Sequence, residues 1–178
     1  MIKLITGPKG SGKTKQLIDM INENLNVVKG NIVCIEKAMQ ETHNINAAVR
    51  LIDVDEYKIA DYGTFYGFFA GVLAGNYDIE QVYVDGLIKV GGKDLEALGE
   101  LLGKVDAIAG DKLVVFTVSS PVEELPESVK KYDIVLLKKN KLIICLISLS
   151  EYNHFLIIGI MFSLEILILP VFAINSIS

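Results

Sequence analysis

Arginine is almost absent from this sequence, since Arg50 is the only one among 178 residues. Enzymes that move a phosphoryl group onto a second nucleotide or a small acceptor commonly clamp the phosphate with several arginines. The guanidinium group suits this task because it contacts phosphate through two parallel hydrogen bonds. The scarcity of arginine therefore disfavours a kinase that acts on a small molecule.

Cysteine is scarce as well. Cys34 and Cys145 stand in apolar runs, without CxxC spacing or nearby histidines, so neither a zinc site nor a disulfide framework is indicated. The first residues lack a basic segment followed by an apolar one, so no secretory signal is expected and the N-terminal part is expected to be cytoplasmic. The formal net charge of −5 gives no strong signal for nucleic-acid binding.

Residues 7–14 read GPKGSGKT and satisfy the pattern G-x-x-x-x-G-K-[ST] at every fixed position. An apolar run over residues 2–5 precedes this loop, and apolar residues at helical spacing follow it over residues 15–25. A strand, a glycine-rich loop and a helix in this order surround a polyphosphate with backbone N–H groups and with the positive end of the helix. The sequence therefore predicts a nucleotide-binding loop.

The residues expected to contact the nucleotide are those of the loop and the residue after it: Gly7, Pro8, Lys9, Gly10, Ser11, Gly12, Lys13, Thr14 and Lys15. Lys13 is expected to reach the β- and γ-phosphates and to act in catalysis. The Thr14 hydroxyl is expected to ligate the accompanying Mg²⁺.

Two acidic residues stand at the ends of predicted strands. Residues 31–36 (NIVCIE) are apolar without alternation, as in a strand buried on both faces, and they end on Glu36. Residues 82–84 are apolar and run into Asp85, which is expected to hold Mg²⁺ opposite Thr14. Ligands gather at the carboxyl ends of parallel strands, so both carboxylates are expected at the same edge as the loop. The alternative role for Asp85 is a turn with the following glycine.

Further strands and helices alternate along the chain. Strands are expected over residues 49–54, 112–118 and 132–137, and helices over residues 63–75 and 92–109. This alternation predicts an α/β fold with three layers, in which helices cover both faces of a mainly parallel five-stranded sheet. The predicted domain spans residues 1–137.

Glycine recurs at every fourth residue in one predicted helix, at Gly63, Gly67, Gly71 and Gly75. An interior glycine costs about 1 kcal/mol relative to alanine. The row therefore predicts the close approach of a neighbouring backbone. Tight packing on the sheet is the preferred interpretation, and a helix contact in a dimer is the alternative.

Residues 138–178 form a hydrophobic C-terminal tail of different character. No lysine or arginine follows Lys141, and residues 155–174 carry a single charge, Glu165. This stretch is long enough to span a bilayer, with the preceding lysines on the cytoplasmic side. One interpretation is an anchor that tethers the domain to the inner face of the membrane. A second interpretation is that the tail adds secondary structure to the domain. A third is that it is not a selected part of the fold.

The loop and Asp85 resemble the Walker A and Walker B elements of a P-loop NTPase. A guanine-reading N-K-x-D element is not expected, because its nearest match has Ile143 in place of the aspartate. Many ATPases of this family carry a glutamate directly after Walker B, where this chain has Gly86. ATP is therefore the expected nucleotide, and the catalytic carboxylate has to come from elsewhere.

RecA-like ATPases place that glutamate at the end of the strand after the first helix, and Glu36 matches this position, with a solvated carboxylate at a strand end as the alternative. They also carry a polar sensor at the end of the strand after Walker B, which Thr117 or Ser119 matches. Residues 1–137 resemble, more closely, a group of small uncharacterised bacterial ATP-binding proteins that are sometimes labelled twitching-motility ATPases. The acidic and histidine boxes of pilus-retraction ATPases are not located in this sequence.

The resemblance implies a slow Mg²⁺-dependent ATPase that needs a protein partner or assembly into a homo-oligomer. A nucleotide-dependent switch or binding module with little hydrolysis is the alternative, and a small-molecule kinase is the third hypothesis.

Overall fold

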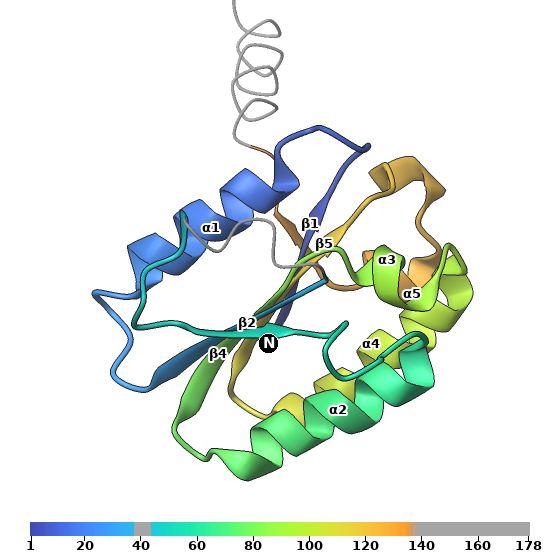
Figure 1. Ribbon diagram of the computed structural model, residues 1–178. Helices are drawn as coiled ribbons and strands as arrows, with labels where there is room; N and C mark the ends of the chain where they lie inside the picture. The colour runs from blue at the N-terminus through green and yellow to red at the C-terminus, as the bar shows by residue number, and fades with distance from the viewer. Residues whose placement is uncertain (38–43, 136, 138–178) are drawn as a thin grey trace, which may run out of the picture. The chain divides into compact units, whose positions relative to one another are not determined.

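The computed structural model describes residues 1–37, 44–135 and 137. The strands are β1 (Ile2–Thr6), β2 (Asn31–Glu36), β3 (Arg50–Asp53), β4 (Ile79–Val84), β5 (Leu113–Val118) and β6 (Asp133–Val135). The helices are α1 (Lys13–Asn24), α2 (Tyr62–Gly75), α3 (Leu87–Gly91), α4 (Leu95–Ala109) and α5 (Glu127–Lys130), with a short 3₁₀ helix at Val122–Glu124. Strands and helices alternate along most of this length, which confirms the predicted α/β class (Figure 1).

All strands of the described part of the chain belong to one parallel sheet, in the order β3-β2-β4-β5-β1-β6. The prediction of five strands was wrong, because the described residues form six. β3 is a short edge strand that pairs with β2 from Val33 opposite Arg50 to Glu36 opposite Asp53. The central strands β2, β4, β5 and β1 are neighbours, so their carboxyl ends form one continuous edge.

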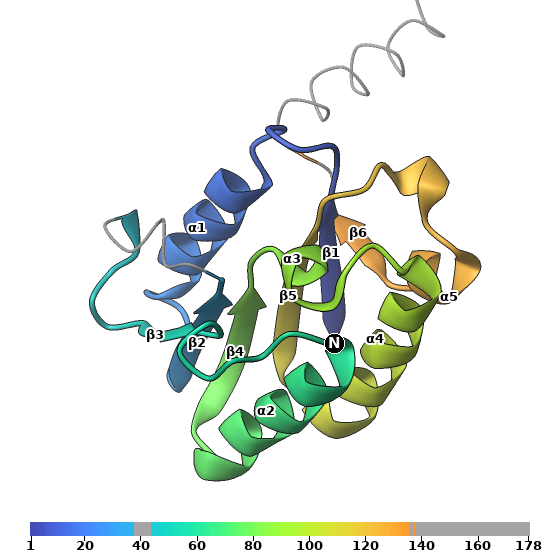
Figure 2. The same cartoon turned by 45° about the vertical axis from the view of Figure 1, so that its right-hand side comes forward.

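Helices cover both faces of the sheet, and the strand residues alternate between them (Figures 1 and 2). On one face α1 packs its buried side chains, Leu17 and Ile21, into a cluster with Cys34 and Tyr83. α2 and α4 cover the other face of the sheet. Their buried side chains belong to a second cluster, which includes Val33 of β2. Apolar residues on both faces explain why these strands lack a polar alternation.

The glycine row of α2 faces away from the sheet. Phe65 and Phe69 are fully buried on the inner side, whereas Gly67 and Gly71 are exposed. A Cβ atom built at Gly67, Gly71 or Gly75 would meet nothing within 4 Å among the described residues. The prediction that these glycines allow tight packing on the sheet was therefore wrong, and the aromatic residues make that contact instead. A helix contact in a dimer stays a prediction.

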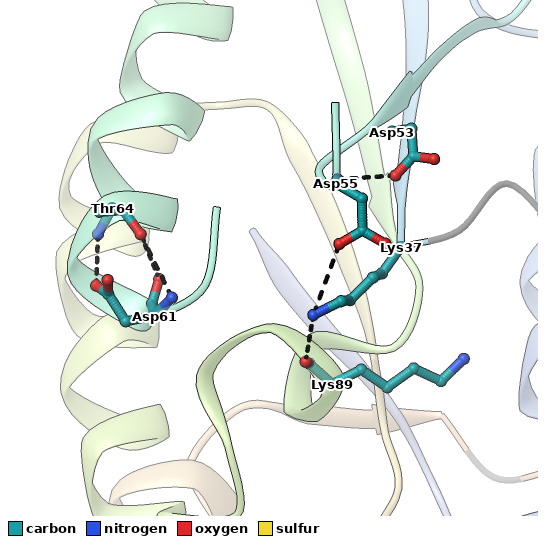
Figure 3. A network of polar contacts seen from close by, with 6 residues as sticks. All are labelled: Lys37, Asp53, Asp55, Asp61, Thr64 and Lys89. Atoms are coloured by element: carbon teal, nitrogen blue, oxygen red, sulfur yellow. Dashed lines mark hydrogen bonds and ion pairs between the residues drawn. The ribbon is translucent and has the colours of Figure 1, made fainter. Parts of the chain in front are cut away.

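Short side-chain caps set where two helices begin. Asp61 accepts a 2.8 Å hydrogen bond from the backbone N–H of Thr64 at the start of α2 (Figure 3). Asp94 accepts from the backbone N–H groups of Glu96 and Ala97, so α4 begins at Leu95. The helix was predicted to begin at residue 92. It begins at Leu95 instead, because Asp94 is its N-cap.

The predicted membrane anchor over residues 155–174, and the whole tail 138–178, lie outside the described residues. Within the residues that are described, no helix has both the length and the apolar character needed to cross a membrane.

Candidate nucleotide-binding site

The loop between β1 and α1 adopts a conformation that glycine makes accessible. β1 ends at Thr6 and α1 begins at Lys13, as the motif requires. Gly10 and Gly12 have φ angles of +79° and +91°, in the left-handed region where a side chain would be strained. The start of the loop is joined to the segment that follows β5 by a 2.9 Å hydrogen bond from the Gly7 N–H to the Ser120 carbonyl.

Lys13 places its ammonium inside this loop. The Lys13 Nζ donates to the carbonyls of Gly7, at 2.9 Å, and Pro8, at 2.8 Å, with the Ser11 hydroxyl 3.5 Å away. Burial lowers the pKa of Lys13, whereas the nearby Asp85 carboxylate raises it and Lys89 lowers it further. The ammonium of Lys13 contacts only neutral carbonyl and hydroxyl oxygens among these three groups. An anion would interact with it more strongly than these neutral oxygens do.

Asp85 follows β4 and is contacted by two hydroxyl groups from other elements. The Thr14 hydroxyl donates to it, with distances of 3.0 Å to Oδ2 and 3.2 Å to Oδ1. The Thr117 hydroxyl at the end of β5 donates to Oδ1 at 2.6 Å, and it accepts a 2.7 Å bond from the Gly86 N–H. Both contacts fix the orientation of the carboxylate, which is 9% exposed.

The donor set of Thr14 and Asp85 fits a magnesium ion. A hydroxyl and a carboxylate oxygen are hard ligands, and Mg²⁺ usually keeps several waters and substrate oxygens besides one or two protein groups. Within residues 1–37, 44–135 and 137, no group of three or more His, Cys, Asp or Glu side chains could hold a metal ion. A magnesium ion at this position would therefore depend on phosphate and water for its other ligands.

A cleft of about 280 Å³ opens over the loop and the ends of β4 and β5. Its lining consists of Lys9, Gly10, Gly12, Lys13, Thr14, Asp85, Gly86, Lys89, Thr117 and Ser119. Ligand pockets usually enclose about 300–1,000 Å³, so this volume suits a phosphate chain better than a whole nucleotide. Three lysines and one aspartate among the lining residues give a net charge of +2, which favours an anion.

Five of the predicted site residues lie outside this lining, namely Gly7, Pro8, Ser11, Lys15 and Glu36. The Lys15 side chain is exposed and borders a separate hollow with Asp19 and Asn44. Glu36 lies at the end of β2 and is only 4% exposed. It follows the pair of Ile35 and Val84, so the strand register puts it beside Asp85 at the sheet edge.

A polar network connects the end of β2 to α3 (Figure 3). The Lys37 ammonium donates to the backbone carbonyl of Lys89 at 3.1 Å and lies 3.7 Å from the Asp55 carboxylate. Asp55 is in turn positioned by its N–H, which donates to Asp53 Oδ1 at 2.9 Å. The carboxyl end of β2, the turn after β3 and the short helix α3 are thereby held together.

Sequence reasoning missed Lys89, which the structure brings to the cleft. The local signal was small, because a lysine in a short apolar segment after Asp85 looks like any solvated helix residue. Only the sharp turn at Gly86, with φ of +69°, starts α3 immediately and keeps Lys89 beside the loop.

Models of protein families give no match to this chain, and a search of curated proteins gives no significant match.

Proposed function

We propose that this protein is an ATP-binding P-loop protein of the RecA-like type, which hydrolyses ATP slowly to ADP and phosphate with the help of Mg²⁺. The observation that carries this proposal is the contact of Thr14 with Asp85 beside the buried ammonium of Lys13. A hydroxyl, a carboxylate and a cation at the mouth of a glycine loop form the set of groups that phosphoryl transfer requires.

In this proposal the chain's own groups bind and orient the triphosphate. The backbone N–H groups of the glycine loop hold the phosphates, and Lys13 exchanges the Gly7 and Pro8 carbonyls for phosphate oxygens. Thr14 and Asp85 would hold Mg²⁺, which neutralises charge that develops on the phosphate oxygens. Glu36, next to Asp85 on the neighbouring strand, positions the attacking water and accepts its proton.

Slow turnover is expected for the isolated chain. Arg50, the only arginine, is at the start of the edge strand β3, away from the lining of the cleft. Catalytic arginines are worth about 10³–10⁵ in rate in related chemistry. A partner, or a second copy of this chain, would supply such a group in trans.

A nucleotide-dependent switch with little hydrolysis is the second candidate function. It is favoured by Gly86, which stands directly after Asp85 where many ATPases carry a catalytic glutamate. Single-turnover hydrolysis, compared with ATP-dependent self-association, separates the two candidates. The kinase hypothesis has least support, because acceptor-binding arginines are missing from the sequence.

The proposal is tested with the purified full chain by calorimetric titration with ATP in the presence of Mg²⁺, and by phosphate release. We expect saturable binding that Lys13→Ala reduces at least tenfold, because it removes the cation within the loop. Lys104→Ala removes an exposed lysine of α4 and serves as the matched control. The absence of ATP binding by the unaltered chain, or equal binding by the Lys13 variant, contradicts the proposal.

A further inference from the structure

Lys89 lies at the cleft although it belongs to an element that the nucleotide-binding motifs do not include. It follows Asp85 by four residues and lines the same cleft as Lys13 and Thr14. Leu87 and Val90 of α3 are buried, which fixes the rotation of this short helix on the sheet. The position of Lys89 is therefore set by the burial of Leu87, which precedes it, and of Val90, which follows it.

The side chain of Lys89 folds back over Gly86 instead of pointing straight into solvent. A Cβ atom built at Gly86 would lie 3.1 Å from the Lys89 Cδ and 3.3 Å from its Cε. Gly86 is in turn held by its N–H bond to Thr117, the residue that also orients Asp85. The stem of Lys89 thus crosses the turn that joins Asp85 to α3, on the side of the cleft.

The backbone of Lys89 is anchored, whereas its ammonium is at the end of a flexible stem. The Lys89 carbonyl accepts the 3.1 Å hydrogen bond from Lys37, which ties α3 to the end of β2. Figure 3 shows the Lys89 side chain extending away from the Lys37 ammonium, and no contact of the network is drawn to the Lys89 ammonium. Lys89 and Lys13 line the same cleft; burial is the main cause that lowers the pKa of Lys13, and the positive charge of Lys89 lowers it further.

We propose that Lys89 contacts the terminal phosphate of a bound nucleoside triphosphate and makes the site prefer triphosphate over diphosphate. This inference rests on the proposed function. The loop backbone would hold the α- and β-phosphates, and Thr14 and Asp85 would hold a metal ion that neutralises charge on the phosphates. Because Lys89 lines the same cleft as Asp85 and Lys13, its ammonium is placed to meet the γ-phosphate. Lys89 supplies within the chain one positive charge of the kind that arginines supply in other enzymes.

The inference is tested by measuring the affinity of the full chain for Mg²⁺ with a non-hydrolysable ATP analogue, and separately with ADP. We expect Lys89→Met to weaken binding of the analogue about tenfold or more, the loss of one charge-assisted contact, and to change ADP binding less than twofold. Lys89→Arg should retain the preference. Lys93→Met is the matched control, because it removes an exposed lysine outside the cleft.

The outcomes separate this inference from the proposal on which it rests. If the Lys89→Met variant keeps the unaltered ratio of triphosphate to diphosphate affinity while Lys13→Ala abolishes binding, the role of Lys89 is wrong and the nucleotide site stands. If the unaltered chain binds neither nucleotide, both are overturned. Lys89 is exposed, so its replacement is not expected to alter folding, and unchanged circular dichroism and thermal midpoint check this.

Discussion

The Thr117 hydroxyl donates a 2.6 Å hydrogen bond to the Asp85 carboxylate, across two neighbouring strands of the sheet. Thr117 is 1% exposed, and the same oxygen accepts the N–H of Gly86. This buried hydroxyl contacts both the Asp85 carboxylate, which Thr14 also contacts, and the turn that follows Asp85. Thr14, Asp85, Gly86 and Thr117 are thus joined by hydrogen bonds at the sheet edge.

Replacing Thr117 with valine removes this hydrogen bond and leaves the shape of the side chain nearly unchanged. We expect the variant to lose about 1–3 kcal/mol of stability, because the Gly86 N–H group loses its acceptor and the buried Asp85 carboxylate loses one of its two hydroxyl donors. We also expect ATP affinity to depend less on Mg²⁺, because Asp85 is no longer held toward Thr14. Urea unfolding and ATP titrations with and without Mg²⁺ measure both effects. Thr117→Ser should behave like the unaltered chain, and an unchanged Mg²⁺ dependence in the valine variant would remove Thr117 from the site.

Glu36→Gln tests the catalytic carboxylate. Glutamine keeps the size of this buried side chain but cannot accept a proton, and general-base catalysis typically contributes about 10²–10⁴-fold in rate. We expect ATP turnover to fall by about 10² or more, with nucleotide affinity within twofold of the original. Steady-state phosphate release and calorimetry provide the two measurements. Glu100→Gln, on the exposed side of α4, is the control, and full turnover in the Glu36 variant would exclude Glu36 from the mechanism.

Two glycine substitutions are expected to have opposite effects on stability. Gly71 lies on the exposed side of α2 with open space around it, so Gly71→Ala should stabilise the fold by about 0.5–1 kcal/mol through helix propensity. Gly91 is packed against Tyr62, and a methyl group there would overlap the Tyr62 ring. Gly91→Ala should therefore destabilise it. Thermal and urea unfolding of the two variants test the pair, and a loss of stability in Gly71→Ala would show that another surface covers α2 in solution.

Asp61 is expected to contribute to stability in a pH-dependent way. The hydrogen bond from the Thr64 backbone N–H, followed by the Thr64 hydroxyl, lowers the pKa of Asp61 below its usual value. Its contribution is therefore fully present above the unfolded-state pKa and is lost as the pH falls through the lower folded-state pKa. Asparagine also caps helices but does not titrate. Asp61→Asn should show a smaller loss of unfolding free energy between pH 7 and pH 3, and an identical loss in both proteins would contradict this role.

The glycine loop and the strands around it could be predicted from the sequence, because their signals are local. Positive φ angles at Gly10 and Gly12 follow from residue type, and continuous apolar runs such as residues 31–36 follow from burial on both faces. The predicted pairing of Thr14 with Asp85 across 71 residues rested on a resemblance, and the two side chains are in contact in the structure. Their assignment to Mg²⁺ stays a prediction.

Tertiary structure alone decided the features that depend on which surfaces meet. The glycine row of α2 is compatible with either an inner or an outer face, and the buried Phe65 and Phe69 turn it outward. Lys89 has no local signal of its own, since its place at the cleft comes from the turn at Gly86 and from the packing of α3. A sequence pattern records backbone preference and polarity at each position. It does not record which distant segments pack against each other in the core.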